Sequence, residues 1–245
     1  MTSSCRRKPE PLRKLVSAAL WSGFAFAVAA AAQPAFEGLS SGEVLEYSLD
    51  WPSGLSAGTA EFEARFLDPG WRFEATVRAS HPKAEIDDRF ISQTDGQLCS
   101  RSFEKHIRHG RKRASELLRF AGGQLDRTNL ERVGEERPAT TRTTECARDA
   151  LTFVYFLRLE LAAGRIPPAA TVYFGAGYNI RLEHAQERWL AWEGERRLVD
   201  EVHVSVRGPM AEHQFSAFFD RSEGRLPLLF GMTLDETDFT MRLLE

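Results

Sequence analysis

Short runs of alternating apolar and polar residues recur from Glu43 onward, and they constrain the fold more than any other feature. A period of two places all the apolar side chains of a run on one face of an extended strand, as in a half-buried β-strand. The turn sequence Asp68-Pro69-Gly70 separates two such runs and predicts a hairpin. The same pattern predicts two strands at residues 178–184 and 188–192 and a last strand at 239–243.

One segment departs from this alternation. Residues 149–164 are apolar almost all round, with Arg158 and Glu160 as the only charges after Asp149. The length, the leucine and alanine content and the closing Gly164 favour a helix, and a helix that is apolar on every side is buried. We therefore expect a mostly β protein of the α+β class. In it, a curved antiparallel sheet or half-barrel of about eleven or twelve strands is wrapped around one buried helix.

The first residues have the organisation of a secretory signal peptide. Five basic residues precede an uncharged stretch at residues 15–32, which ends in Ala30-Ala31-Ala32. This arrangement predicts cleavage before Gln33 and export to the periplasm. The alternative, an uncleaved anchor, is disfavoured because the stretch is short and alanine-rich for a span of ~20 residues. The expected organisation is a signal peptide at 1–32, a short lead at 33–41 and a single β-rich domain at 42–245, with no transmembrane segment after cleavage.

Cleavage changes the charge and leaves two cysteines. The remaining residues include 27 basic and 34 acidic side chains, a net charge of −7. An acidic domain is poorly suited to neutralise phosphates, so we expect no nucleic-acid partner. In an oxidising compartment Cys99 and Cys146 are expected to form a disulfide, worth roughly 4 kcal/mol for a loop of this length. The alternative, a redox pair, normally requires the close spacing of C-x-x-C.

The candidate catalytic and metal motifs lack the context that their chemistry requires. G-x-S-x-G occurs at residues 38–42 and 54–58, but a nucleophile elbow needs a strand before the serine and a helix after it. Glu201 and His203 supply two of the three or four ligands of a zinc site. The pair Asp87-Asp88 is typical of a turn. We therefore expect a protein that is not an enzyme, with no catalytic residue, metal or cofactor.

A basic cluster straddles His109-Gly110 and predicts a hairpin tip. As a solvated loop the cluster needs no function, whereas as a binding site it would contact phosphate headgroups or an acidic partner. Its members are Lys105, Arg108, Arg111, Lys112 and Arg113.

Aromatic residues concentrate in the predicted helix and strands. They are candidates for lining a ligand pocket, because a sheet curled round one helix often leaves apolar space. The alternative is a packed core, which is the norm in protein interiors. The candidates are Trp51, Trp71, Phe73, Phe153, Tyr155, Phe156 and Tyr178.

Four stretches, 42–60, 109–113, 149–158 and 219–227, together resemble an uncharacterised family of bacterial envelope proteins, the domain of unknown function 3108. The stretch at 149–158 is the most recognisable, while the family more often has Glu at the position of His109. The resemblance covers residues 42–245 and implies an exported, β-rich protein of the Gram-negative envelope. It implies no reaction and no catalytic residues. In architecture alone, a sheet around a helix is similar to periplasmic lipoprotein carriers.

Three functional hypotheses follow. The first is a periplasmic protein that binds or carries an apolar or amphipathic envelope molecule such as a lipid, and an apolar cavity too small for an acyl chain would contradict it. The second is a non-enzymatic interaction module in cell-envelope assembly, which would act on an envelope protein through an exposed apolar patch. The third is a hydrolase, against which stands the lack of a visible nucleophile, base and orienting group.

Overall fold

The computed structural model describes residues 39–81, 84–132, 139–209, 212–222, 224–234 and 237–244. All of them belong to one compact unit, Pro34–Glu245. The predicted signal peptide at 1–32 and most of the predicted lead at 33–41 lie outside the described residues. Within the described ranges, no helix has the length and hydropathy needed to cross a membrane.

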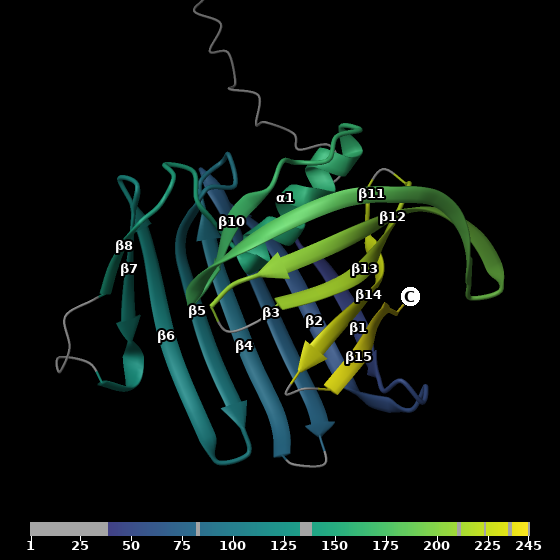
Figure 1. Ribbon diagram of the computed structural model, residues 1–245, viewed down its shortest axis with the longest axis horizontal. Helices are drawn as coiled ribbons and strands as arrows, with labels where there is room; N and C mark the ends of the chain where they lie inside the picture. Colours follow the sequence, from purple (N-terminus) through teal and green to yellow (C-terminus); the bar gives the residue numbers. More distant parts are fainter. Residues whose placement is uncertain are drawn as a thin grey trace, which may run out of the picture. The chain divides into compact units, whose positions relative to one another are not determined.

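The described residues form fifteen strands, which all belong to one sheet (Figure 1). The strands are β1 (Glu43–Asp50), β2 (Ser56–Leu67), β3 (Gly70–His81), β4 (Ala84–Thr94), β5 (Ser100–His109), β6 (Lys112–Ala121), β7 (Gln124–Asn129), β8 (Ala139–Arg142), β9 (Arg148–Asp149), β10 (Ala170–Phe174), β11 (Ala176–Trp192), β12 (Glu195–Arg207), β13 (Glu212–Asp220), β14 (Pro227–Leu234) and β15 (Thr237–Leu243). A short 3-10 helix, Leu130–Arg132, follows β7.

Strands that are neighbours in the sequence are also neighbours in the sheet, except for β8 and β9, between which the curled sheet is open. The order is β8-β7-β6-β5-β4-β3-β2-β1-β15-β14-β13-β12-β11-β10-β9. The first and last strands pair, with Tyr47 opposite Leu243. Successive strands β8 and β9 do not pair and instead form the two edges of the sheet. We call the segment that joins these edges, residues 142–148, the seam.

Helix α1, Ala150–Ala162, starts directly after the seam. Asp149 caps its first turn by accepting a hydrogen bond from the backbone N–H of Thr152. Two residues after the end of the helix lies Gly164, whose φ of 70° is a left-handed conformation that glycine adopts without strain. The N–H of Gly164 donates to the carbonyl of Leu161 at 3.0 Å, which satisfies one of the last helical acceptors.

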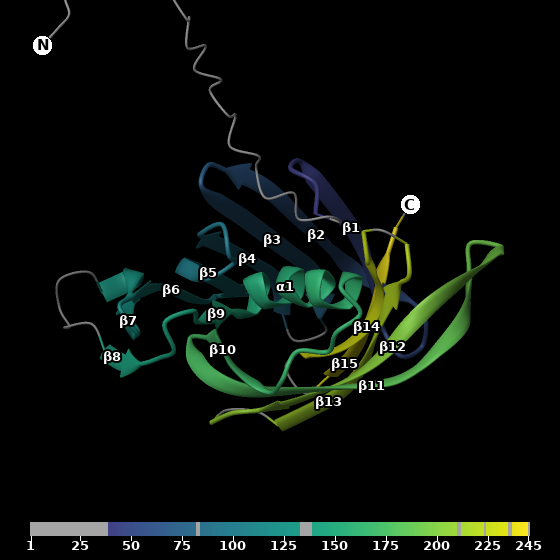
Figure 2. The same ribbon diagram turned by 90° about the horizontal axis from the view of Figure 1, so that it is seen from above.

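The helix presents opposite faces to two groups of strands. On one face Tyr155 stacks its ring on Phe73 of β3, with 4.0 Å between the ring centroids. On the other face Phe153 and Leu157 pack in a buried cluster with residues of β10 to β13. Figure 2 shows α1 between these two parts of the curled sheet. The expectation of a mostly β protein with one helix and a large curled sheet is therefore confirmed.

The strand boundaries differ from the prediction in three respects. The strands predicted at 178–184 and 188–192 are one continuous strand, β11, because a register shift between His184 and Gln186 absorbs the break in alternation. The short strands β8 and β9, and β14 with its run of apolar residues, lack the alternating pattern and were not predicted. Asp87 and Asp88 lie within strand β4 and not in a turn.

Candidate functional site

An apolar space of about 160 Å³, partly open to solvent, lies between α1 and the inner face of β10 to β13; we call it the helix groove. Apolar side chains line it almost completely. They include Phe153, Val154 and Leu157 of α1, Val172 of β10, Ile180 and Leu182 of β11, Val204 and Val206 of β12, and Phe215, Ala217 and Phe219 of β13.

The alternation of the strands produces this apolar wall. Ile180 lies opposite Val206 and Leu182 lies opposite Val204. Val204 in turn lies opposite Phe215 of the next strand. Because directly opposed side chains point to the same face of a sheet, these residues form a continuous apolar ladder that faces the helix.

The volume of the helix groove limits what it can hold. Ligand pockets for drug-sized molecules have volumes of about 300 Å³ or more, so a space of about 160 Å³ does not enclose a whole lipid. An apolar cavity of about 150 Å³ is known to bind benzene. The helix groove therefore fits an apolar group of about six carbon atoms. This size restricts the carrier hypothesis to a ligand that inserts a short segment.

A second hollow, of about 540 Å³, lies at the seam, and we call it the seam pocket. It is lined by Arg142, Thr144, Cys146 and Arg148 from the seam and by residues of β10. Phe153 also lines it, as does Val172. Both of these side chains also line the helix groove, so the two spaces adjoin.

Arg148 is an unusual cation in the seam pocket. Its guanidinium carbon lies 3.7 Å from the centre of the Phe156 ring. Its Nε is buried and has no hydrogen-bond partner among the described residues. Burial lowers the pKa of Arg148, although the charges of Glu160 and Asp95 act in the opposite direction. An arginine stays charged in proteins, so the seam pocket contains a partly desolvated positive charge.

The outer face of the same strands has a larger hollow, of about 680 Å³, with polar walls. Its charged side chains pair with each other. Arg181 contacts Glu183 at 2.9 Å, and Arg207 contacts Glu212 at 2.7 Å. Because these pairs are exposed and of opposite sign, the outer hollow has no unbalanced charge that would favour one kind of ligand.

A buried polar network fixes the seam to the start of α1. Asp149 is fully buried, and its Oδ2 accepts hydrogen bonds from the hydroxyls of Ser92 at 2.6 Å and Ser100 at 2.5 Å. Thr152 donates to Asp149 through its hydroxyl at 2.8 Å and through its backbone N–H at 2.9 Å. Burial raises the pKa of Asp149, although the hydrogen bonds from Ser100, Ser92 and Thr152 favour the ionised form.

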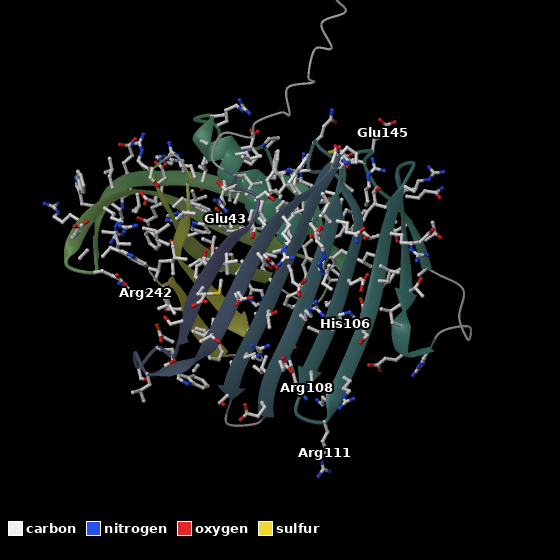
Figure 3. The ribbon with its side chains drawn as sticks, turned by 180° about the vertical axis from the view of Figure 1, so that it is seen from behind. Glu43, His106, Arg108, Arg111, Glu145 and Arg242 are labelled. Carbon is white, nitrogen blue, oxygen red and sulfur yellow. A yellow bond between two sulfur atoms is a disulfide. The ribbon has the colours of Figure 1, made fainter. Side chains whose placement is uncertain are left out.

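A second buried charge fixes the middle of α1. The Arg158 side chain is 2% exposed and binds both carboxylate oxygens of Glu43, at 2.5 and 2.8 Å. It also donates to the carbonyl of Gly224 at 2.8 Å. Figure 3 shows Glu43 on β1, at the end of the strand near the helix. This bidentate pair fixes the position of α1 relative to β1. The Asp149 network and the Arg158–Glu43 pair therefore both position the helix.

The disulfide predicted between Cys99 and Cys146 is present, with the two Cα atoms 4.7 Å apart. It joins the start of β5 to the seam. Directly beside it, the N–H of Ser100 donates to the carbonyl of Ala147 at 2.9 Å. The seam is therefore attached to β5 by a covalent bond and a backbone hydrogen bond.

The seven aromatic pocket candidates lie in different places. Trp71, Phe73 and Tyr155 belong to one buried cluster, with Phe156 packed against it. Trp51 packs against a second cluster and Tyr178 against a third. Of the seven, Phe153 is the one that lines the helix groove. Aliphatic residues, which were not among the candidates, form most of its wall.

The basic cluster forms the tip of the β5–β6 hairpin, as the sequence indicates. Arg111, Lys112 and Arg113 are exposed, and Figure 3 shows Arg111 pointing away from the sheet. Two members have acidic neighbours, since Lys105 lies 3.6 Å from Glu116 and Arg108 pairs with Asp87. The exposed part is therefore small, and it lies on a hairpin that does not line the helix groove.

The motifs with a possible chemical role occupy ordinary structural positions. Ser56 is the first residue of β2, so the second G-x-S-x-G motif continues into a strand; the first motif includes Gly38, which lies outside the described residues. Glu201 accepts from Gln186 at 3.0 Å. No group of three or more His, Cys, Asp or Glu side chains in the described ranges is placed to hold a metal.

Sequence reasoning missed Arg148 and the role of Arg158. A strand of two residues such as β9 has no periodic pattern, so nothing in the sequence distinguished Arg148. Arg158 had a usable signal, because a lone arginine in a helix that is apolar on every side requires a buried partner. The partner itself, Glu43, lies 115 positions away in the sequence and was not predictable.

Comparison with protein families gives one match. The family described as "Protein of unknown function (DUF3108)" matches residues 46–243, which include all the strands described above except the first residues of β1. No curated protein matches the chain significantly.

A solved structure shows the same fold. The β-barrel-like protein of the domain of unknown function DUF1849 from Brucella abortus superimposes with a TM-score of 0.59. The superposition covers 82% of this chain and 95% of the other, at 10% sequence identity. Because the identity is so low, the similarity concerns the fold alone.

Proposed function

The chain belongs to the DUF3108 family of proteins of unknown function, and we propose that it is a non-enzymatic binding protein of the cell envelope. In this proposal the chain is exported to the periplasm, its sheet wraps around α1, and the helix groove receives a short apolar segment of an apolar or amphipathic molecule. The rest of that molecule stays outside the groove.

The observation that supports this function is the chemical character of the helix groove. Native interiors are close-packed, so an apolar space beside a buried helix that side chains do not fill is exceptional. The walls of the groove are almost wholly apolar, yet the space is partly open to solvent. Transferring an apolar group from water into such a space is favourable by about 25 cal/mol per Å² of apolar surface buried.

Because α1 is held in a fixed position, the groove has a defined shape. The Asp149 network and the Arg158–Glu43 pair fix α1 at its start and middle. Groups that are held by buried hydrogen bonds lose little freedom when a ligand arrives, so less of the binding free energy is offset by ordering. The groove is therefore suited to bind without rearrangement of the helix.

The small volume also supports a second candidate function. A space of about 160 Å³ accepts one large apolar side chain of a partner protein as readily as the end of an acyl chain. This is the interaction module in envelope assembly. The two functions differ in the occupant, since a small amphiphile alone fills the groove in the first and a protein is required in the second.

The proposal is tested by filling the groove. Val154 lies half-buried on α1 and lines the helix groove. We expect Val154→Phe to weaken binding of a neutral dialkylaminobenzonitrile dye, whose single benzene ring matches the size of the groove and whose fluorescence depends on the polarity of its surroundings, by about tenfold, or ~1.4 kcal/mol. The physical reason is that the added ring occupies space that the dye would fill. The measurement is a fluorescence titration of the predicted mature chain, residues 33–245.

The matched control adds the same ring outside the groove. Val44 on β1 is 50% exposed, so Val44→Phe should leave the dye affinity unchanged. Equal binding to the wild type and to Val154→Phe would contradict the assignment of the groove. A wild type that binds neither the dye nor a small amphiphile, but captures an envelope protein through the groove, would favour the second candidate.

A further inference from the structure

The helix groove and the seam pocket differ in polarity but adjoin each other. The groove is apolar, whereas the lining of the seam pocket includes two arginines, three threonines and Asn179. Phe153 and Val172 line both spaces. A molecule with its apolar end in the groove can therefore reach the seam with its other end.

The charge of the seam pocket has one sign. Arg142 and Arg148 line it, and no Asp or Glu is among its described lining residues. The buried Nε–H of Arg148 has no acceptor among the described residues. Glu160 and Asp95 act on Arg148 through space without contacting it. A buried donor without an acceptor is costly, and an anion in the pocket would satisfy it.

We infer that the ligand of the helix groove is an anionic amphiphile whose carboxylate or phosphate head binds Arg148 in the seam pocket. This inference rests on the proposed function of the groove. The guanidinium is already oriented by its stacking on Phe156, with 3.7 Å between its central carbon and the ring centre. Arginine donates two parallel N–H groups to a carboxylate or phosphate, which gives both affinity and orientation.

The inference predicts a preference for charge at constant chain length. Octanoate and octanol have the same apolar chain and differ in the head. We expect the mature wild-type chain to bind octanoate about tenfold more tightly than octanol, since a charge-assisted hydrogen bond adds to the same apolar contact. Calorimetric titration measures both affinities. The Nε–H resonance of Arg148 should shift with octanoate and not with octanol.

Three variants locate the source of that preference. Arg148→Gln should weaken octanoate binding about tenfold and leave octanol binding unchanged. Arg148→Lys keeps the positive charge but loses the two parallel N–H donors and the stacked guanidinium plane, so it should retain only part of the preference. Arg181→Gln removes an exposed arginine on the outer face of β11 and should change neither affinity. Thermal melting checks that each variant is folded. If Arg148→Gln does not fold, the inference is tested by the affinities of the wild type for octanoate and octanol and by the Nε–H resonance of Arg148.

The outcomes separate this inference from the function on which it rests. Equal affinities for octanoate and octanol, with no effect of Arg148→Gln, would overturn the anionic head and retain the apolar groove. Inorganic phosphate that binds as tightly as octanoate would make the seam a site for free anions and would also overturn the inference. A wild type that binds neither octanoate nor octanol would overturn the proposed function itself.

Discussion

At the scale of single residues, Asp149 combines three roles that usually belong to different side chains. It caps α1, accepts hydroxyl hydrogen bonds from Ser92 and Ser100, and forms the last residue of β9. A fully buried carboxyl with these contacts positions the start of the helix, and Arg148 lies directly before it. The geometry of the seam pocket thus depends on a buried acid that does not line it.

Removal of this carboxyl should destabilise the protein. We expect Asp149→Ala to lower the free energy of unfolding by about 3 kcal/mol, because loss of an N-cap costs ~1 kcal/mol and the buried hydroxyls lose their shared acceptor. Asp149→Asn keeps one acceptor oxygen and should cost about 1 kcal/mol. Urea denaturation of the two variants and the wild type checks both values.

The difference in unfolding free energy between wild type and Asp149→Asn should depend on pH, and the direction of the Asp149 pKa shift gives the sign of that dependence. Burial raises the pKa of Asp149 in the folded state above its ordinary value of 3.8, so the folded protein holds this proton more tightly than the unfolded chain. The part of the stability that comes from this tighter proton binding is therefore complete below pH 3.8 and is lost as the pH rises through the folded-state pKa. The difference in unfolding free energy between wild type and Asp149→Asn should shrink as the pH rises. A difference that is constant or grows with pH would contradict this assignment.

At the scale of elements, the seam connects the two edges of the sheet. It runs from the end of β8 to β9, and the disulfide attaches it to the start of β5. The sequence indicated this bridge, because a pair of cysteines in a chain predicted to be exported is expected to form a disulfide. The elements themselves were predictable where alternation was regular. The two-residue β9 and the bulge in β11 were not, since both depend on pairing and not on local pattern.

Loss of the bridge should loosen the seam. Its cysteines are 47 positions apart, so we expect Cys99→Ala/Cys146→Ala to lower the free energy of unfolding by roughly 4 kcal/mol. Chemical denaturation with and without a reducing agent measures this effect. The reduced wild type should match the double variant under the same conditions, whereas a loss below about 1 kcal/mol would show that the bridge adds little to the fold.

At the scale of the whole molecule, one pairing converts a meander into a curled sheet. Strands β1 and β15 pair, although nearly the entire described chain lies between them. Alternation identified both strands but not their partner, since a period of two defines the faces of a strand and leaves its neighbours open. The helix groove was unpredictable for the same reason, because its walls come from five strands, β10 to β14, and α1. The sequence therefore indicated an apolar interior, but all seven residues predicted to line a pocket are aromatic, whereas the wall of the groove is mostly aliphatic.

The central claim is that the helix groove holds the apolar end of a ligand, and intermolecular NOEs test it most directly. We would measure NOEs between the methyl group of bound octanoate and the methyl groups of the mature chain. If the apolar end of octanoate lies in the helix groove, we expect NOEs to Val154, Leu182 and Val206, which line the groove from α1, β11 and β12. NOEs confined to exposed residues such as Val44 on β1, or none at all under saturating octanoate, would contradict it.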